Sequence, residues 1–158
     1  MKYTIDEIDR RILYILIKDA RTPFLEIARE VGISGAAIHQ RVNKLQKNGI
    51  ITGSRLMVDP SALGLNVCAF VSIVVTESGK LKDVIAALKG IPEVVECHFI
   101  TGKYSLLIKL YCRDNSHLMD VLLGGIQNIP SIQSTETMIS LDKAFERQIK
   151  VRELQLKA

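Results

Sequence analysis

Residues 22–49 read TPFLEIAREVGISGAAIHQRVNKLQKNG, and this stretch decides the fold of the first third of the chain. Thr22-Pro23 predicts the start of a short helix that stops at Gly32, because Thr suits the N-cap, Pro a first helical position and Gly a helix end. Ser34 then predicts the cap of a helix that runs to about Asn48. Only Gly-Ile-Ser separates the two helices, and this spacing predicts a helix-turn-helix.

A further helix is expected before this motif and a strand after it. Apolar residues recur every three or four positions in the chain's first turns, and Thr4 with Glu7, or Asp6, can cap that helix. The segment Ile50–Val58 has strand character, with a bend permitted at Gly53-Ser54, and it predicts a small wing. The N-terminal part is therefore interpreted as a winged helix-turn-helix.

The helix that begins after Ser34 has two distinct faces. At about 100° per residue, Ile38, Val42 and Leu45 share the side that must pack on the other helices. The opposite side combines small residues, amides and lysines, which suits a helix placed in the major groove of DNA. The candidate DNA-binding residues are Ser34, Ala36, Ala37, Gln40, Arg41, Asn43, Lys44, Lys47 and Arg55.

The charge distribution favours a polyanion partner for the N-terminal part only. Residues 1–60 hold ten Lys and Arg against seven Asp and Glu, a net charge of +3, and no acidic residue occurs between Glu30 and Asp59. The alternative is an ordinary solvated helix face, which the acid-free window and the helix-turn-helix spacing count against. Arg41 lies beside the apolar stripe, where it would reach a backbone phosphate or brace the domain.

The rest of the chain predicts a different fold. Strand-like runs at 67–75, 94–101, 104–112 and 132–141 alternate with amphipathic helical stretches, in the order β-α-β-β-α-β. This is the ferredoxin-like plan, so the fold class is α+β. Because Val67–Val75 is apolar on both faces, we expect a second subunit to cover the open face of the sheet.

The predicted domains follow from these changes of pattern. They are a winged helix-turn-helix at 1–58, a linker at 59–66, a ferredoxin-like domain at 67–142 and a C-terminal tail at 143–158. The expected assembly is a homodimer.

Two polar segments interrupt the apolar second domain. One is Thr101–Ser105, and the other is Gln133–Thr137, five consecutive polar side chains inside an expected strand. A strand with one solvated face needs polar residues only at alternate positions. These residues fit the mouth of a site for a small zwitterion, and equally an edge strand kept polar against aggregation.

Other classes of function have little support in the sequence. No phosphate-binding loop, nucleophile elbow or metal-spaced cluster occurs, so we expect no catalytic residue, no metal and no cofactor. The longest apolar run is far shorter than the roughly 20 residues of a membrane helix, and no signal peptide is expected. These features predict a cytoplasmic protein that is not an enzyme and does not bind membranes.

Several motifs together resemble the Lrp/AsnC family of feast/famine regulators. They are IDEIDRRIL at 5–13, RTPFLEIA at 21–28, the run from Val31 to Ile51, Asp59-Pro60 with Leu63-Gly64, and Thr101–Tyr104. The resemblance covers residues 4–150. It implies a transcription regulator of amino-acid metabolism that binds double-stranded DNA. It also implies dimers assembling into octamers, with an amino-acid effector bound between dimers.

The resemblance also implies where the effector binds. Its candidate residues are Gly102, Tyr104, Ser105, Gln133, Ser134, Thr135 and Glu136. The family usually has Asp where this chain has Ser105, and the polar segments look like the AsnC branch, so asparagine is the favoured effector. Leucine, methionine or no effector are alternatives. Some sirohaem decarboxylases resemble the same two-domain layout, which leaves an enzyme as the competing class.

Overall fold

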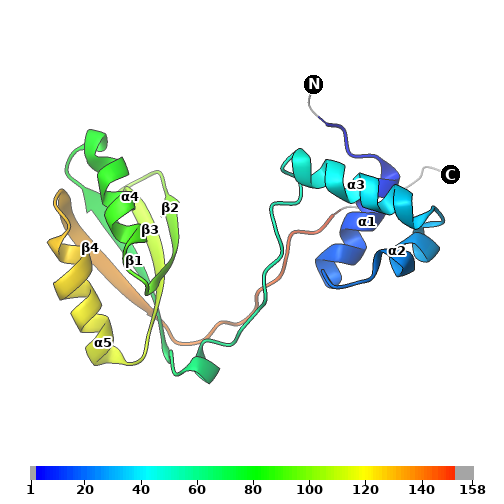
Figure 1. Ribbon diagram of the computed structural model, residues 1–158. Coiled ribbons are helices and arrows are strands. Elements are labelled where there is room, and N and C mark those ends of the chain that lie inside the picture. Colours follow the sequence, from blue (N-terminus) through cyan, green and yellow to red (C-terminus); the bar gives the residue numbers. More distant parts are fainter. Residues whose placement is uncertain (1–2, 152–158) are drawn as a thin grey trace. The chain divides into compact units, whose positions relative to one another are not determined.

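The structure, a computed structural model, describes residues 3–151 and contains two compact units (Figure 1). Residues 3–56 together with 145–151 form a helical unit, and residues 57–144 form a sheet unit. The predicted linker, 59–66, thus lies in the sheet unit, where Ser61–Leu63 makes a short 3-10 turn. Residues 1–2 of the predicted first domain and 152–158 of the predicted tail lie outside the described residues.

The helical unit contains the three expected helices. They are α1, Glu7–Lys18, α2, Phe24–Val31, and α3, Gly35–Lys47. Only three residues separate α2 from α3, and Gly32 closes α2 with a φ of +83°, a conformation that glycine adopts without strain. The helix-turn-helix prediction is confirmed.

The caps of these helices refine the prediction in two places. Asp6, one of the two alternatives for α1, accepts from the N–H of Asp9, and the Asp9 carboxylate accepts from the N–H of Asp6 in return. Pro23 stands at the N-cap of α2, with no side-chain cap. The Thr22 hydroxyl instead donates to the carbonyl of Asp19, so the expectation that Thr22 caps α2 was wrong.

The predicted wing is not formed. Residues 50–58 carry no strand, and their side chains from Thr52 to Val58 are exposed. A strand requires a hydrogen-bonded neighbour, and strand character in the sequence cannot supply one. The wing prediction was therefore wrong for the described part of this chain, and Arg55 lies on an exposed extended segment.

The sheet unit has the expected order of elements. They are β1, Val67–Val75; α4, Leu81–Lys89; β2, Val94–Phe99; β3, Leu106–Cys112; α5, Asn115–Asp120; and β4, Ile132–Ser140. Asp114 caps α5 by accepting from the N–H of His117, and a π-helical turn at Val121–Gly125 continues it. The observed β2 is two residues shorter than predicted at its C-terminal end, and β3 begins two residues later.

All neighbouring strands are antiparallel, in the order β2-β3-β1-β4, which is the ferredoxin-like sheet (Figure 1). Alternate residues of β1 and β3 face the two helices and form one core. This core contains Ala69, Val71, Ile73, Leu106, Ile108 and Leu110 from the strands, and Val84, Leu88, Leu118 and Ile126 from the helical segments. Both helices therefore cover the same face of the sheet, and β4 is an edge strand.

Candidate functional site

Helix α3 separates apolar and polar residues as the sequence predicts. Ile38, Val42 and Leu45 are buried in the helical unit. The Ser34 hydroxyl caps the helix by accepting from the N–H of Ala37 at 3.2 Å. Exposed positions on the rest of the helix include Ala36, Gln40, Asn43, Lys44 and Lys47. The chain thus presents small, amide and cationic side chains on one solvated surface.

One contact on this surface was missed by the sequence analysis. The Asn43 side-chain nitrogen lies 3.0 Å from Nδ1 of His39, one helical turn earlier. The imidazole itself packs edge-on against Phe24 of α2, with ring centroids 5.6 Å apart. His39 therefore orients an amide that was predicted to read DNA. Its position four residues before Asn43 was the available signal.

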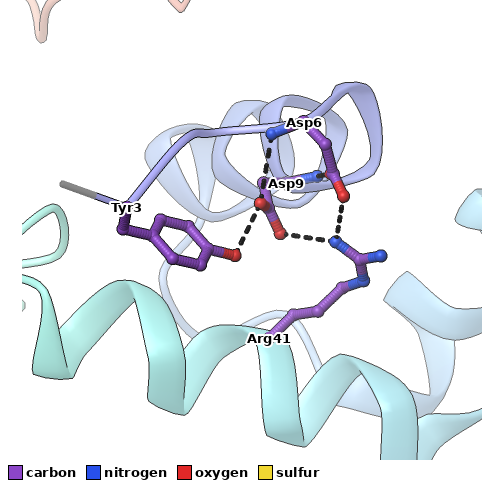
Figure 2. A network of polar contacts seen from close by, with 4 residues as sticks. All are labelled: Tyr3, Asp6, Asp9 and Arg41. Atoms are coloured by element: carbon purple, nitrogen blue, oxygen red, sulfur yellow. Dashed lines mark hydrogen bonds and ion pairs between the residues drawn. The ribbon is translucent and has the colours of Figure 1, made fainter. Parts of the chain in front are cut away.

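Arg41 points away from this surface, towards the N-terminus of α1 (Figure 2). Its Nη1 lies 2.6 Å from Asp6 Oδ2 and 2.9 Å from Asp9 Oδ1. The phenol of Tyr3 donates to the other Asp9 oxygen at 2.8 Å, next to the N–H of Asp6. We call these four residues, Tyr3, Asp6, Asp9 and Arg41, the Arg41 network. It joins α1 to α3.

Burial explains why the Arg41 network needs so many donors. The Asp9 side chain is 0% exposed and that of Arg41 is 27% exposed. A buried carboxylate without donors is strongly destabilising, and here three donors satisfy its two oxygens. Partial burial acts to raise the pKa of Asp6. The Asp9 N–H and the Arg41 guanidinium outweigh that effect, so the pKa lies below its usual value. The hydrogen bonds that Arg41 donates to Asp6 and Asp9 raise the pKa of Arg41.

In the sheet unit, one hydrogen bond joins the two polar segments that the sequence singled out. The Tyr104 hydroxyl donates to Oε2 of Glu136. Ser105 is fixed to β1, because its N–H donates to Ile73 O at 2.8 Å and its hydroxyl accepts from the N–H of Val75. Gly102 has a φ of +116°, which suits glycine in the turn that places Tyr104. Tyr104 and Glu136 thus come together within one chain.

The β4 residues of the predicted site divide between the two faces of the sheet. Thr135 pairs with Ile73, whose side chain lies in the helix-covered core, whereas Glu136 pairs with Ser72 on the open face. Gln133 falls at an irregularity between the pairs of Val74 and Val75. A single chain therefore does not direct these polar side chains into one cleft.

Gln127, which was not among the predicted site residues, contacts Thr135 on the helix-covered side of the sheet. The Gln127 amide donates to the Thr135 hydroxyl at 3.0 Å. A hollow of about 290 Å³ lies beside this bond, lined by Gln127, Ile132, Gln133, Ser134 and Thr135. All of these lining residues are uncharged. Gln127 follows α5 and lies eight residues from Thr135, and no motif in the sequence marks it.

Comparison with known proteins decides the family. Residues 5–46 match the AsnC-type helix-turn-helix domain, and residues 68–149 match the Lrp/AsnC ligand binding domain. The chain is 43% identical over 148 residues to Regulatory protein AsnC of Escherichia coli, covering 94% of this chain and 97% of that one. This chain belongs to the Lrp/AsnC family. It is accordingly a helix-turn-helix DNA-binding regulator.

Solved structures place this Lrp/AsnC chain among regulators of the same architecture. The structure of E. coli AsnC has a TM-score of 0.88 at 42% identity, covering 94% of this chain and 99% of that chain. The feast or famine regulatory protein Rv3291c of M. tuberculosis, complexed with L-methionine, has a TM-score of 0.86 at 28% identity. It covers 93% of this chain and 99% of that chain.

The matched domains of this Lrp/AsnC regulator contain nearly all the candidate residues. Every α3 candidate except Lys47 falls within the matched helix-turn-helix, and all seven effector candidates fall within the matched ligand binding domain. Arg55 lies in neither. Within residues 3–151, no cluster of three metal-ligating side chains occurs, and no helix has the length and apolarity to cross a membrane.

Proposed function

We propose that the regulator reads double-stranded DNA with α3 and adjusts that binding to the supply of one free amino acid in the cytoplasm. The observation that carries the DNA part is the division of α3. One side is fully buried, and the other is an acid-free surface of amides and lysines. A helix of this kind, held by a second helix across a tight turn, fits the major groove.

The proposed roles on this surface follow from the side chains. Ala36 and Ala37 let the helix approach the base edges closely. Gln40 and Asn43 have the amide geometry that pairs with two atoms of adenine, and Lys44 and Lys47 carry charges for backbone phosphates. Ser34 and Arg55 complete the proposed contact set. Arg41 is left out of this set because its guanidinium is paired with Asp6 and Asp9.

The proposed effector is a free amino acid with a neutral polar side chain, asparagine first. Gly102 leaves room for a carboxylate near backbone N–H groups, and Tyr104 would form a wall of the site. Glu136 supplies the charge for the ammonium group, a role supported by the absence of an acid at Ser105. Ser105, Gln133, Ser134 and Thr135 would contact the side chain of the effector.

Assembly is the last part of the proposal. The open face of the sheet bears Phe70, Val74, Leu107 and Tyr111 at positions that alternate with the covered core. A second copy placed over this face would give the homodimer. Because the β4 residues of one chain point to both faces, we propose a site completed between dimers of a larger even assembly, with an octamer expected.

One experiment tests the effector and its link to assembly. Each of the twenty amino acids is titrated into the full-length protein by calorimetry, and sedimentation follows the oligomer. We expect asparagine to bind and to shift the oligomeric state, since binding at a shared site must be coupled to assembly. Glu136→Ala should abolish this response while the unliganded protein still binds DNA.

The controls separate the parts of the proposal. Glu77→Ala changes an exposed acid outside the proposed site and should respond like the wild type. If asparagine neither binds nor changes the assembly, its choice as effector is wrong. If no amino acid binds, the sensor is wrong, and the DNA part is judged on its own by retention of duplex DNA at moderate salt.

A further inference from the structure

Arg41 belongs to the helix that carries the DNA-binding surface, yet its side chain is held by α1 (Figure 2). Two carboxylates contact one guanidinium nitrogen, so the formal charge of the three groups is −1. A phosphate would therefore compete with both carboxylates for Arg41. Removal of Arg41 from them would also leave Asp9, which is 0% exposed, with an uncompensated charge.

The position of Arg41 along α3 gives this contact a geometric effect. Arg41 directly follows Gln40 and precedes Lys44 by one turn, and it borders the buried stripe of Ile38 and Val42. Apolar packing is non-directional and leaves a helix some freedom to turn about its axis. Two short ion pairs have a defined direction, so they fix the rotation that points Gln40 outward.

We propose that the Arg41 network is a positioning device that sets the rotation of α3 for base recognition, and that Arg41 is not a phosphate contact. Tyr3, Asp6 and Asp9 thereby act on DNA recognition without touching DNA. This inference rests on the proposed reading of DNA by α3. It changes the role of one residue in that set and adds three residues to it.

The test uses a duplex selected by the wild-type protein from a random-sequence library and a scrambled duplex of equal length. Enrichment of a sequence by the wild type tests the proposed function itself. Affinities for both duplexes are then measured over a range of salt for Arg41→Lys, Arg41→Gln and the control Lys47→Gln. A thermal melt establishes that each variant is folded at the assay temperature.

The proposal predicts a separate pattern for each variant. Arg41→Lys keeps the charge, but its freely rotating ammonium on a flexible stem lacks the fixed N–H directions of the guanidinium, so the selected-to-scrambled affinity ratio should fall at least about fivefold. The slope of log affinity against log salt concentration, called the salt slope here, should stay at the wild-type value for Arg41→Lys and Arg41→Gln. Lys47→Gln removes the charge that would neutralise one phosphate, so it should lower the slope by about one and keep the ratio.

A measurement without DNA keeps the result interpretable if no sequence is enriched. Hydrogen exchange of the full-length protein should be faster in α3 and at the start of α1 for Arg41→Lys, and unchanged for Lys47→Gln. Unchanged exchange in Arg41→Lys, a lowered salt slope in Arg41→Gln, or an unchanged affinity ratio in Arg41→Lys would each overturn the proposal.

Discussion

Acidic residues differ in burial and in hydrogen bonding between the Arg41 network and the polar segments of the sheet unit. Asp9 is buried and receives three donors from its own chain. Glu136 is exposed and receives one hydrogen bond, from Tyr104. Polar groups satisfied inside a chain fix its structure, whereas exposed ones keep their capacity for water or a ligand. The first arrangement suits positioning and the second suits binding.

The largest effect on stability should come from removing the buried ion pairs of the Arg41 network. Arg41→Met keeps the aliphatic stem but leaves the Asp9 carboxylate without its cation. Loss of one partner from a buried ion pair costs about 3–5 kcal/mol, and we expect a decrease of this size in the free energy of unfolding. Urea denaturation followed by circular dichroism measures it. Arg55→Met, on an exposed segment, should change stability by less than about 0.5 kcal/mol.

Substitutions on the polar surface of α3 should change DNA affinity rather than the stability of the fold. Gln40→Ala should weaken binding to the selected duplex by about 1–3 kcal/mol and relax one base position. Lys44→Ala should weaken binding to all sequences alike and flatten the salt dependence. Fluorescence anisotropy with selected and scrambled duplexes measures both. Equal losses on the two duplexes for both variants would contradict the assignment of roles.

The exposed polar segments of the sheet unit should tolerate loss of the hydrogen bond between Tyr104 and Glu136. Tyr104→Phe removes the donor to Glu136 but keeps the ring, so the free energy of unfolding should fall by no more than about 1 kcal/mol. Calorimetry with asparagine should nevertheless show weaker binding, because Glu136 loses the partner that orients it. A destabilisation as large as that of Arg41→Met would mean that the two regions do not differ.

The smallest effect concerns pH. The pKa of Asp6 lies below its ordinary value of 3.8 in the folded protein. Its charged form is therefore favoured by folding, and the stability that it contributes is present above about pH 4 and lost as the pH falls through the folded pKa. Between about pH 5 and 3, the wild type should lose more stability than Asp6→Asn, which keeps an N-cap side chain. Parallel loss in the two proteins would contradict this.

Local patterns carried the successful part of the sequence analysis. Ser34 caps the helix that it was expected to cap, and β1 has the predicted bounds. Each depends on residues close in sequence, where capping and periodicity act. Asp9 and Arg41 are 32 residues apart, and their contact depends on how α1 packs against α3. The sequence offered phosphate contact or bracing as alternatives, and only the tertiary structure shows the ion pairs.

The wing and the polar run of β4 depend in different ways on contacts that the sequence does not show. The wing at Ile50–Val58 has the composition of a strand, but pairing requires a neighbour that composition does not reveal. Alternation along β4, by contrast, was sufficient to place Thr135 and Glu136 on opposite faces. The consecutive polar run drew attention to the segment as a whole, and the register with β1 shows which side chains can act together.

The strand order also constrains when each unit can fold during synthesis. Helices α1 to α3 are complete by Lys47, so these three helices can pack together while the ribosome is still making the rest. Strand β1 cannot complete its pairing until β4 emerges, since Cys68 pairs with Ser140. Until then β1 can pair only with β3, and its other edge stays open, which makes the sheet unit the more exposed of the two to aggregation during synthesis.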